Sequence, residues 1–246
     1  MKYYFLSDAH LGCRMIADTH AHEQKLVDWL DMAQKDATAL FLLGDIFDFW
    51  FEYTYVVPKG FTRVLGKLRE ITEKGISVHF FVGNHDLWTF GYLQDEIGLT
   101  VHYSPETMQL GNKQFFLAHG DGLGDKSRTF SLIRVIFHNK VCQWLFRTLI
   151  PPSWGLKFGY TWSKNNRKKH EKANVGYQGE EKEPLVRFAK KHAKEHAIDY
   201  YLFGHRHILL HLMLANKSQM IILGDFMREF SYATFDGESV CLENFE

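Results

Sequence analysis

Short apolar runs that end abruptly in polar residues recur along the chain. Six of them, at residues 3–6, 40–43, 76–82, 115–118, 200–203 and 221–223, have the length of buried strands. Apolar residues at helical spacing predict helices over residues 22–34, 87–97 and 184–197, and a further helix that Pro58 opens and Gly75 ends. Helices and strands therefore alternate in the first half of the chain.

Strand patterns dominate the second half. Turn residues such as Gly111 and Asn112 separate them. The predicted strands lie at residues 100–102, 107–110, 114–118, 199–203, 208–214, 219–223, 231–235 and 239–242. This order predicts an α/β (α+β) fold in which two mixed β-sheets pack as a sandwich flanked by helices. We expect residues 1–246 to form one domain that contains a helical insert at residues 126–183.

Chain length and cysteine content favour a cytoplasmic protein. With 246 residues the chain can bury a core that needs no disulfide. Its three cysteines are far apart and form no CxxC pair, so we expect reduced thiols. Asp8 interrupts the first apolar run too early for a signal peptide, and no run approaches the roughly 18 apolar residues of a membrane span.

Residues that can bind metal ions follow these six apolar runs directly. In an open α/β sheet, ligands bind beyond the carboxyl ends of the strands, so residues at several strand ends predict one shared site. The set contains two carboxylates, one amide and four imidazoles: Asp8, His10, Asp45, Asn84, His119, His205 and His207.

Seven oxygen and nitrogen donors are too many for one tetrahedral zinc ion. They suit two divalent metal ions that share a carboxylate, an arrangement that can activate water and neutralise a phosphoryl group. The absence of a thiolate favours Mn²⁺, with Fe or Zn as alternatives. The glycines that precede Asp45, Asn84 and His205 allow sharp turns and close approach of the backbone.

The motif order DxH, GD, GNHD, H and GHxH resembles that of the calcineurin-like metallophosphoesterases, over residues 2–124 and 198–235. This resemblance implies that Asp45 bridges two metal ions. One would be held by Asp8, His10, Asp45 and His207, and the other by Asp45, Asn84, His119 and His205. It also implies that His85 is catalytic, contacting the phosphoryl oxygens or protonating the leaving group, and that Asp86 orients the His85 ring.

Charge is distributed unevenly along the chain. Ten Lys and Arg residues and no Asp or Glu lie between residues 126 and 170, so the remainder holds 19 basic and 29 acidic residues. This basic stretch is also rich in Phe, Leu, Ile, Val and Trp. Such a surface suits an anionic amphiphilic substrate, and peripheral contact with the cytoplasmic face of the inner membrane.

The basic insert, the GDIFDFW stretch and the LGDF sequence near the end resemble one branch of the family, which hydrolyses UDP-2,3-diacylglucosamine in the lipid A pathway. This resemblance implies cleavage to UMP and 2,3-diacylglucosamine 1-phosphate. By the same resemblance, the candidate substrate contacts are Asp125, Ser163, Lys164, Arg167 and Lys168. Better-known members of that branch carry GNRD, with arginine in place of His85, which leaves the substrate open.

Two other functions are compatible with parts of the sequence. A soluble nucleotide phosphodiesterase or nuclease could use a basic, aromatic insert to stack bases. The mostly aliphatic and Phe composition of the insert suits acyl chains better, so nucleic acid is not an expected partner. A non-enzymatic scaffold would be expected to have lost ligands, and all seven are present. The insert could also be a homodimer interface, so the oligomeric state stays open.

Overall fold

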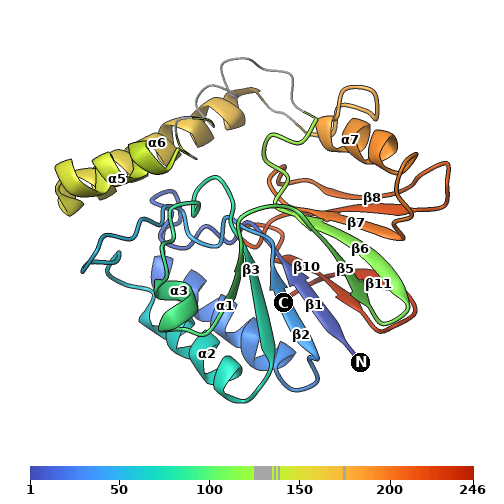
Figure 1. The fold of residues 1–246 in the computed structure, drawn as a ribbon, viewed down its shortest axis with the longest axis horizontal. Helices are drawn as coiled ribbons and strands as arrows, with labels where there is room; N and C mark the ends of the chain where they lie inside the picture. The colour runs from blue at the N-terminus through green and yellow to red at the C-terminus, as the bar shows by residue number, and fades with distance from the viewer. Residues whose placement is uncertain (125–134, 136, 138, 174–175) are drawn as a thin grey trace.

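Two mixed β-sheets face each other in the computed structural model, which describes residues 1–124, 135, 137, 139–173 and 176–246 (Figure 1). The first sheet has the order β11-β10-β1-β2-β3-β4 and the second β5-β6-β7-β9-β8. The first contains β1 (Tyr3–Leu6), β2 (Ala39–Leu42), β3 (Ser77–Phe81), β4 (Thr100–His102), β10 (Ser231–Phe235) and β11 (Val240–Asn244). The second contains β5 (Glu106–Leu110), β6 (Lys113–Ala118), β7 (Tyr200–Phe203), β8 (Leu209–Met213) and β9 (Gln219–Leu223). The predicted two-sheet architecture is confirmed.

Parallel pairing brings together the strand ends that precede the predicted metal ligands. Strands β1, β2 and β3 are parallel neighbours in the first sheet, and β6, β7 and β9 are parallel neighbours in the second. The carboxyl ends of three strands therefore meet at one edge of each sheet. Antiparallel strands β10 and β11 extend the first sheet beyond β1, and β5 and β8 form the outer strands of the second.

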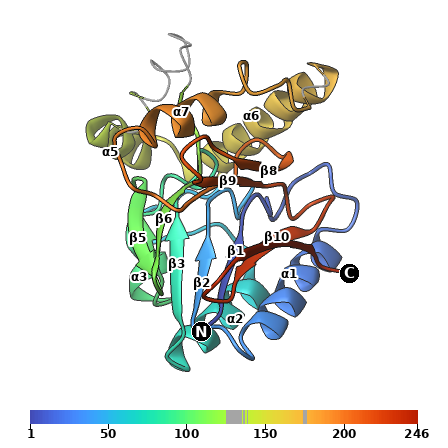
Figure 2. The same ribbon diagram turned by 90° about the vertical axis from the view of Figure 1, so that its right-hand side faces the viewer.

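Helices cover the outer faces of both sheets (Figures 1 and 2). Helices α1 (Thr19–Ala33) and α2 (Thr62–Glu73) pack on the first sheet, and α7 (Pro184–His192) packs on the second. The space between the sheets is filled mainly by apolar side chains, such as Phe5, Phe41 and Phe115. Strands β1, β2 and β7 are buried along their whole length, which explains their uninterrupted apolar sequences.

Two predicted helices begin later than their sequences suggest. The second helix begins at Thr62 rather than at Pro58, because Phe61 adopts a left-handed conformation with φ of 61°. Glu23 of α1 accepts hydrogen bonds from the first amides of this helix instead of a local cap. The prediction of a helix over residues 87–97 is wrong in its first part, since α3 spans only Tyr92–Asp95.

Glu52 explains the late start of α3. Its buried carboxylate accepts hydrogen bonds from the Thr89 hydroxyl and from the backbone amides of Phe90 and Tyr92. A buried carboxylate is stable only when its oxygens are satisfied, so these donors are drawn away from helical pairing. Sequence periodicity does not show such a long-range partner.

Helices also occur in the predicted insert. Helix α5 (Lys140–Leu149) and helix α6 (Pro152–Ala173) are separated by Ile150 and Pro151, and lie beyond the end of the first sheet at the upper left of Figure 1. Pro152 is the first residue of α6, a position where the missing amide hydrogen costs nothing.

A half-buried histidine pair makes stability depend on pH. His79 Nδ1 lies 3.0 Å from His102 Nε2, and the His79 ring stacks on Phe41. Burial, with a smaller effect of His102, lowers the pKa of His79 from its usual 6.5 to about 4. Below pH 6.5 the unfolded chain therefore gains a proton that the folded chain does not, and stability falls as the pH approaches 4.

We predict that His79→Phe weakens this dependence. Urea unfolding at pH 7.5 and pH 5.0 should show that the wild type loses more free energy of unfolding than the variant, in which the ring stack on Phe41 is kept. Histidines that do not contact His79 are common to both proteins and cancel in the comparison, whereas loss of the His102 contact is part of the measured effect. An equal loss in the two proteins would contradict the prediction.

Candidate metal centre

The loops after β1, β2, β6 and β7 are joined by backbone hydrogen bonds at one edge of the two sheets. The amide of Asp8 donates to the carbonyl of Gly44, and that of His10 donates to the carbonyl of Asp45. In the second sheet the amide of Gly204 donates to the carbonyl of His119. Across the sheets, the amide of His205 donates to the Asp8 carboxylate at 2.9 Å.

Six of the seven predicted ligands come together there in two groups. Asp8, His10 and His207 form one group, and Asp45, His119 and His205 form the other, with ligand atoms within 4.8 Å of one another in each. Asn84, the seventh, is exposed in the loop after β3. A third group, formed by His10, Asp48 and His85, adjoins the first.

Asp45 lies between the two main groups. Its Oδ2 atom is 3.6 Å from His10 Nε2 and 3.3 Å from His119 Nε2. Its Oδ1 atom instead accepts a hydrogen bond from the backbone amide of His85 at 2.9 Å. One oxygen thus fixes the side chain, while the other faces imidazoles from both groups.

Five of these residues have a left-handed backbone that side chains rarely adopt. The φ angles are 54° at Asp8, 44° at His10, 53° at Asp45, 68° at His205 and 49° at His207. Each such conformation costs on the order of 1 kcal/mol and persists only where surrounding contacts enforce it. Left-handed backbone is concentrated at the predicted ligands. We conclude that these loops are shaped to hold the ligands, at a cost in stability.

Two glycines allow the loops to approach each other. A Cβ atom at Gly83 would lie 2.2 Å from Asp45 Oδ1, and one at Gly204 would lie 2.5 Å from Asp8 Oδ2. Both positions precede a predicted ligand in the sequence. Any larger residue would push the two carboxylates away from the imidazoles.

Histidine orientation follows one rule at this site. The Nδ1 atom of His119 lies 2.8 Å from the Leu43 carbonyl oxygen, and that of His85 lies 2.7 Å from the Asp48 carbonyl oxygen. His207 Nδ1 lies 3.3 Å from Asp225 Oδ2. Since these acceptors require a proton on Nδ1, the Nε2 atoms are left to face the carboxylates and any bound cation.

Asp48 and Asp225 are positioning residues that sequence reasoning did not assign. Asp48 Oδ1 lies 3.7 Å from His10 Nδ1, and Asp225 also accepts backbone hydrogen bonds from residues 227–229. The sequence signals were their place in the GDIFDFW and LGDF stretches and, for Asp225, its position after the apolar run at residues 221–223.

The Asp86 carboxylate contacts backbone amides, while His85 Nδ1 lies against the Asp48 carbonyl oxygen, so the orienting role of Asp86 stays a prediction. Its carboxylate is fully buried and accepts hydrogen bonds from the amides of Gly83 at 2.7 Å and Ile46 at 2.8 Å, with longer ones from Asp45 and Phe47. Asp86 therefore ties the loop after β3 to the loop after β2. Burial, together with the charge of Asp45, raises the pKa of Asp86 to about 7.

Electrostatics at the centre favour an anionic carboxylate between imidazoles. Burial alone would raise the pKa of Asp45, but His119, His85 and His10 together hold it well below the usual value. Burial opposes protonation of His119, but Asp45 and Asp8 raise its pKa well above normal. Burial and the neighbouring His119 instead lower the pKa of His205, and burial raises that of Asp8. Positive charge is thus stabilised where the two groups meet.

This arrangement fits divalent metal ions. Asp8 Oδ1 is buried and accepts no hydrogen bond within the described part of the chain, although His207 Nε2 and His10 Nε2 lie 3.4 and 3.6 Å away. A buried oxygen without a partner is costly unless a cation satisfies it. Carboxylate and imidazole donors are those that Mn²⁺, Fe and Zn²⁺ accept in mixed coordination.

Two of the five predicted substrate contacts lie in the described part of α6, and one of them contacts the third group. Ser163 is buried and donates to Asp48 Oδ1 at 2.9 Å, and Lys164 is exposed on α6. Asp125 lies outside the described residues, as do the side chains of Arg167 and Lys168. These assignments stay predictions.

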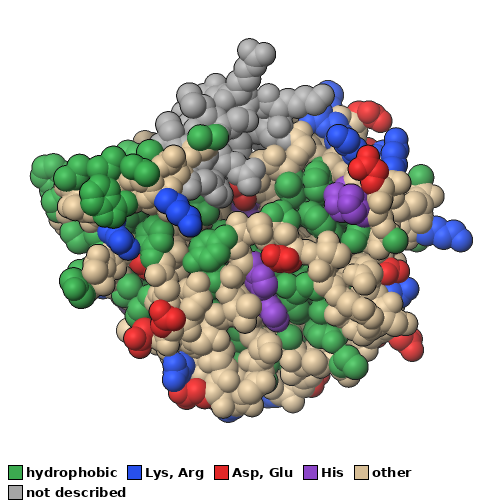
Figure 3. All heavy atoms as spheres, viewed as in Figure 1, with side chains coloured by type: hydrophobic (Ala, Val, Ile, Leu, Met, Phe, Trp, Pro, Cys, Tyr) green, Lys and Arg blue, Asp and Glu red, His purple; other side chains and the backbone are tan. Residues whose placement is uncertain are grey.

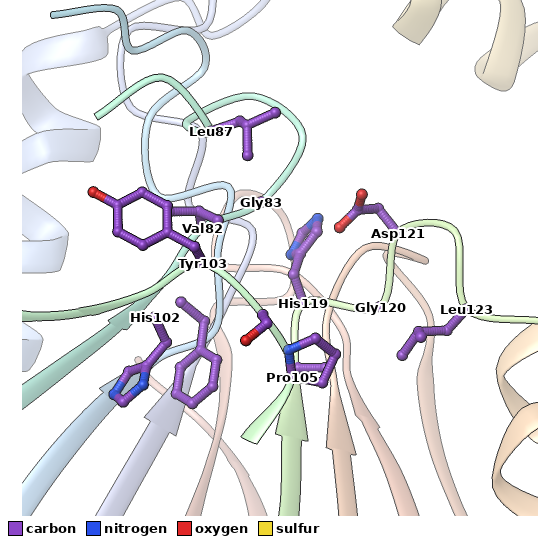
Figure 4. A pocket seen from close by; sticks show the side chains of 13 residues that line it. Val82, Gly83, Leu87, His102, Tyr103, Pro105, His119, Gly120, Asp121 and Leu123 are labelled. Carbon is purple, nitrogen blue, oxygen red and sulfur yellow. The ribbon is translucent and has the colours of Figure 1, made fainter. Parts of the chain in front are cut away.

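A small cavity of about 30 Å³ opens beside His119 (Figure 4). The side chains of His119 and Asp121 point into the same space, and Tyr103 and Leu87 line its other side. It has room for a water molecule or two, which is far too little for a nucleotide.

Comparison with known proteins identifies the class to which this site belongs. The model of the calcineurin-like phosphoesterase family matches residues 1–209. The chain belongs to this family and is a metal-dependent phosphoesterase, as its sequence motifs predicted.

Full-length relatives are more specific. The chain is 41% identical over 257 residues to a UDP-2,3-diacylglucosamine hydrolase of Porphyromonas gingivalis, covering all of this chain and 98% of the relative. It is 25% identical to a protein of the same name from Shewanella baltica, covering 99% and 97% of the two chains. Among solved structures, a dimetal phosphatase of Danio rerio aligns with a TM-score of 0.47 and 12% identity, covering 100% of this chain and 99% of that one.

His85 can act either on substrate or as a ligand, and the two roles give different results. We predict that His85→Ala lowers turnover by about 10²–10⁴-fold, the usual contribution of a general acid, while bound metal stays near wild type. Metal content by plasma mass spectrometry, beside turnover, tests this. His211→Ala, which removes an exposed histidine of β8, is the matched control. Loss of one metal per chain in His85→Ala would show that His85 is a ligand of the third group.

Proposed function

We propose that the protein hydrolyses UDP-2,3-diacylglucosamine to UMP and 2,3-diacylglucosamine 1-phosphate. The observation that carries this proposal is the 41% identity to a UDP-2,3-diacylglucosamine hydrolase over the whole chain, insert included. The P. gingivalis relative covers the loops of the metal centre and helices α5 and α6 in one alignment.

In this proposal the two groups are the two metal sites. Asp8, His10 and His207 hold one ion, and His119, His205 and Asn84 hold the other, with Asp45 between them. Two divalent ions, for which we propose Mn²⁺, supply a nucleophilic water and neutralise the phosphoryl charge. Because the Asp48 carbonyl accepts a hydrogen bond from His85 Nδ1, the Nε2 atom of His85 faces the space between the metal ligands. His85 is therefore placed to donate to a phosphoryl oxygen or the leaving group.

Helices α5 and α6 supply a surface for acyl chains. No residue of α5 is buried, and the exposed fractions are 68% for Leu149, 70% for Trp154 and 51% for Phe158. Figure 3 shows an apolar region at the upper left, where α5 and α6 lie in the same view of Figure 1. The basic residues Arg147 and Lys157 lie close to these exposed apolar residues in the sequence. We propose that residues 1–246 form one metallophosphoesterase domain, and that residues 126–183 within it act as a lid that carries this surface.

The same surface supports a location at a membrane. None of the helices in the described ranges is long and apolar enough to cross a bilayer. We propose a cytoplasmic protein in which exposed apolar and basic side chains of α5 and α6 make peripheral contact with an anionic membrane.

Hydrolysis of the named lipid tests the proposal. We predict that detergent-dispersed UDP-2,3-diacylglucosamine with Mn²⁺ releases UMP at a higher kcat/KM than bis-p-nitrophenyl phosphate gives. Cleavage of the nitrophenyl ester alone would contradict the lipid assignment and favour a nucleotide phosphodiesterase.

Two surface variants distinguish loss of lipid binding to α5 and α6 from a general loss of activity. Leu149→Ser should raise KM for the lipid by about tenfold, the effect of losing one buried leucine, and leave hydrolysis of the nitrophenyl ester unchanged. Met213→Ser removes an equally exposed apolar side chain from β8 and should change neither. Equal KM values for the lipid in both variants would argue against an acyl-chain site on α5 and α6.

A further inference from the structure

Helix α6 packs unusually closely on the loop that follows Asp45. Gly155, Gly159 and Ser163 are four residues apart and lie on one face of the helix. A Cβ atom at Gly159 would lie 2.4 Å from the Phe49 ring, and one at Gly155 would lie 2.3 Å from the Tyr53 hydroxyl. Small residues are therefore required where α6 meets residues 49–53.

Tyr160 adds a second contact between this helix and the loops of the centre. Its ring meets Phe49 edge-on at 6.2 Å, and the Arg14 guanidinium lies over it at 4.9 Å. Arg14 belongs to the loop that follows Asp8 and His10. The position of α6 is thus tied to the loops after β1 and β2.

Ser163 is the polar end of this interface. It is 2% exposed, and its hydroxyl donates to Asp48 Oδ1 at 2.9 Å. The same oxygen lies 3.7 Å from His10 Nδ1, and Asp48 itself is buried. The Asp48 backbone carbonyl accepts a hydrogen bond from Nδ1 of His85. One residue of the loop therefore contacts the insert, a proposed metal ligand and the proposed catalytic histidine.

We infer that Ser163 is a positioning residue through which helix α6 sets the metal affinity of the centre. Its hydrogen bond holds the Asp48 carboxylate against the Nδ1 side of His10, so that His10 Nε2 stays directed at Asp8 and Asp45. A carboxylate behind a ligand histidine fixes its ring and tautomer and typically changes metal affinity by about 10–100-fold. This inference rests on the proposed assignment of His10 as a metal ligand.

Coupling between the helix and the metal is reciprocal. If docking of α6 tightens metal binding, bound metal must stabilise the docked helix by the same factor. Metal binding at the centre and docking of the acyl-chain surface on α6 then each increase the affinity of the other. A substrate that engages α6 would increase retention of the metal ion at His10.

The test is Mn²⁺ binding to the full-length protein in the absence of substrate. We predict that Ser163→Ala weakens one of the two Mn²⁺ sites by about tenfold, as loss of a hydrogen bond to a charged group should, and that Ser163→Thr restores most of the affinity. Thr161→Ala removes an exposed hydroxyl from the same helix and should have no effect. Free Mn²⁺ is measured by electron paramagnetic resonance during titration of metal-free protein.

A double-mutant cycle identifies the route of the effect. Asp48→Asn should weaken the same site by about 10–100-fold, and Ser163→Ala should add little in the Asp48→Asn background because both act through one carboxylate. Unchanged Mn²⁺ affinity in Ser163→Ala, with only KM for substrate altered, would overturn the inference and leave Ser163 as a substrate contact. A wild-type protein that binds no Mn²⁺ would overturn both this inference and the proposed metal centre.

Discussion

The centre depends on the close approach of two neighbouring loops, in which Asp45 lies against the backbone of Gly83. Parallel pairing of β2 and β3 sets the loops side by side, and Asp86 then accepts amide hydrogens from both. This contact leaves Asp45 Oδ2 facing His10 and His119. Left-handed backbone at Asp8, His10 and Asp45 is strain that these contacts hold in place.

Stability and function are divided between different parts of the fold. Aromatic and aliphatic side chains fill the space between the sheets and beneath α1, α2 and α7. The strand ends instead carry buried carboxylates and imidazoles whose mutual interactions move their pKa values in opposite directions. These buried charges are favourable when a cation is bound and unfavourable without one. The rigid sheets hold the loops that carry them in place.

Much of this could be predicted, because strand ends and ligand types are local signals. Apolar runs followed by DxH, GD, HGD and GHxH indicated both the sheet edge and the residues that meet there. The contacts of Asp48 and Asp86 could not be predicted, because each has partners that are distant in sequence: Ser163 for Asp48, and the amides of the loop after β2 for Asp86. The late start of α3 has the same origin in Glu52. Periodicity describes which face of a segment is apolar, but not which buried carboxylate competes for its amides.

The most direct test of the centre is anomalous X-ray scattering from crystals grown with Mn²⁺. The account predicts two peaks per chain about 3.5–4 Å apart, the separation typical of two-metal sites. One peak should lie among Asp8, His10 and His207, the other should lie among Asp45, His119 and His205, and an Asp45 oxygen should be within reach of both. A single peak, or a peak among His10, Asp48 and His85 in place of one of these, would contradict the proposal that Asp45 bridges two metal ions.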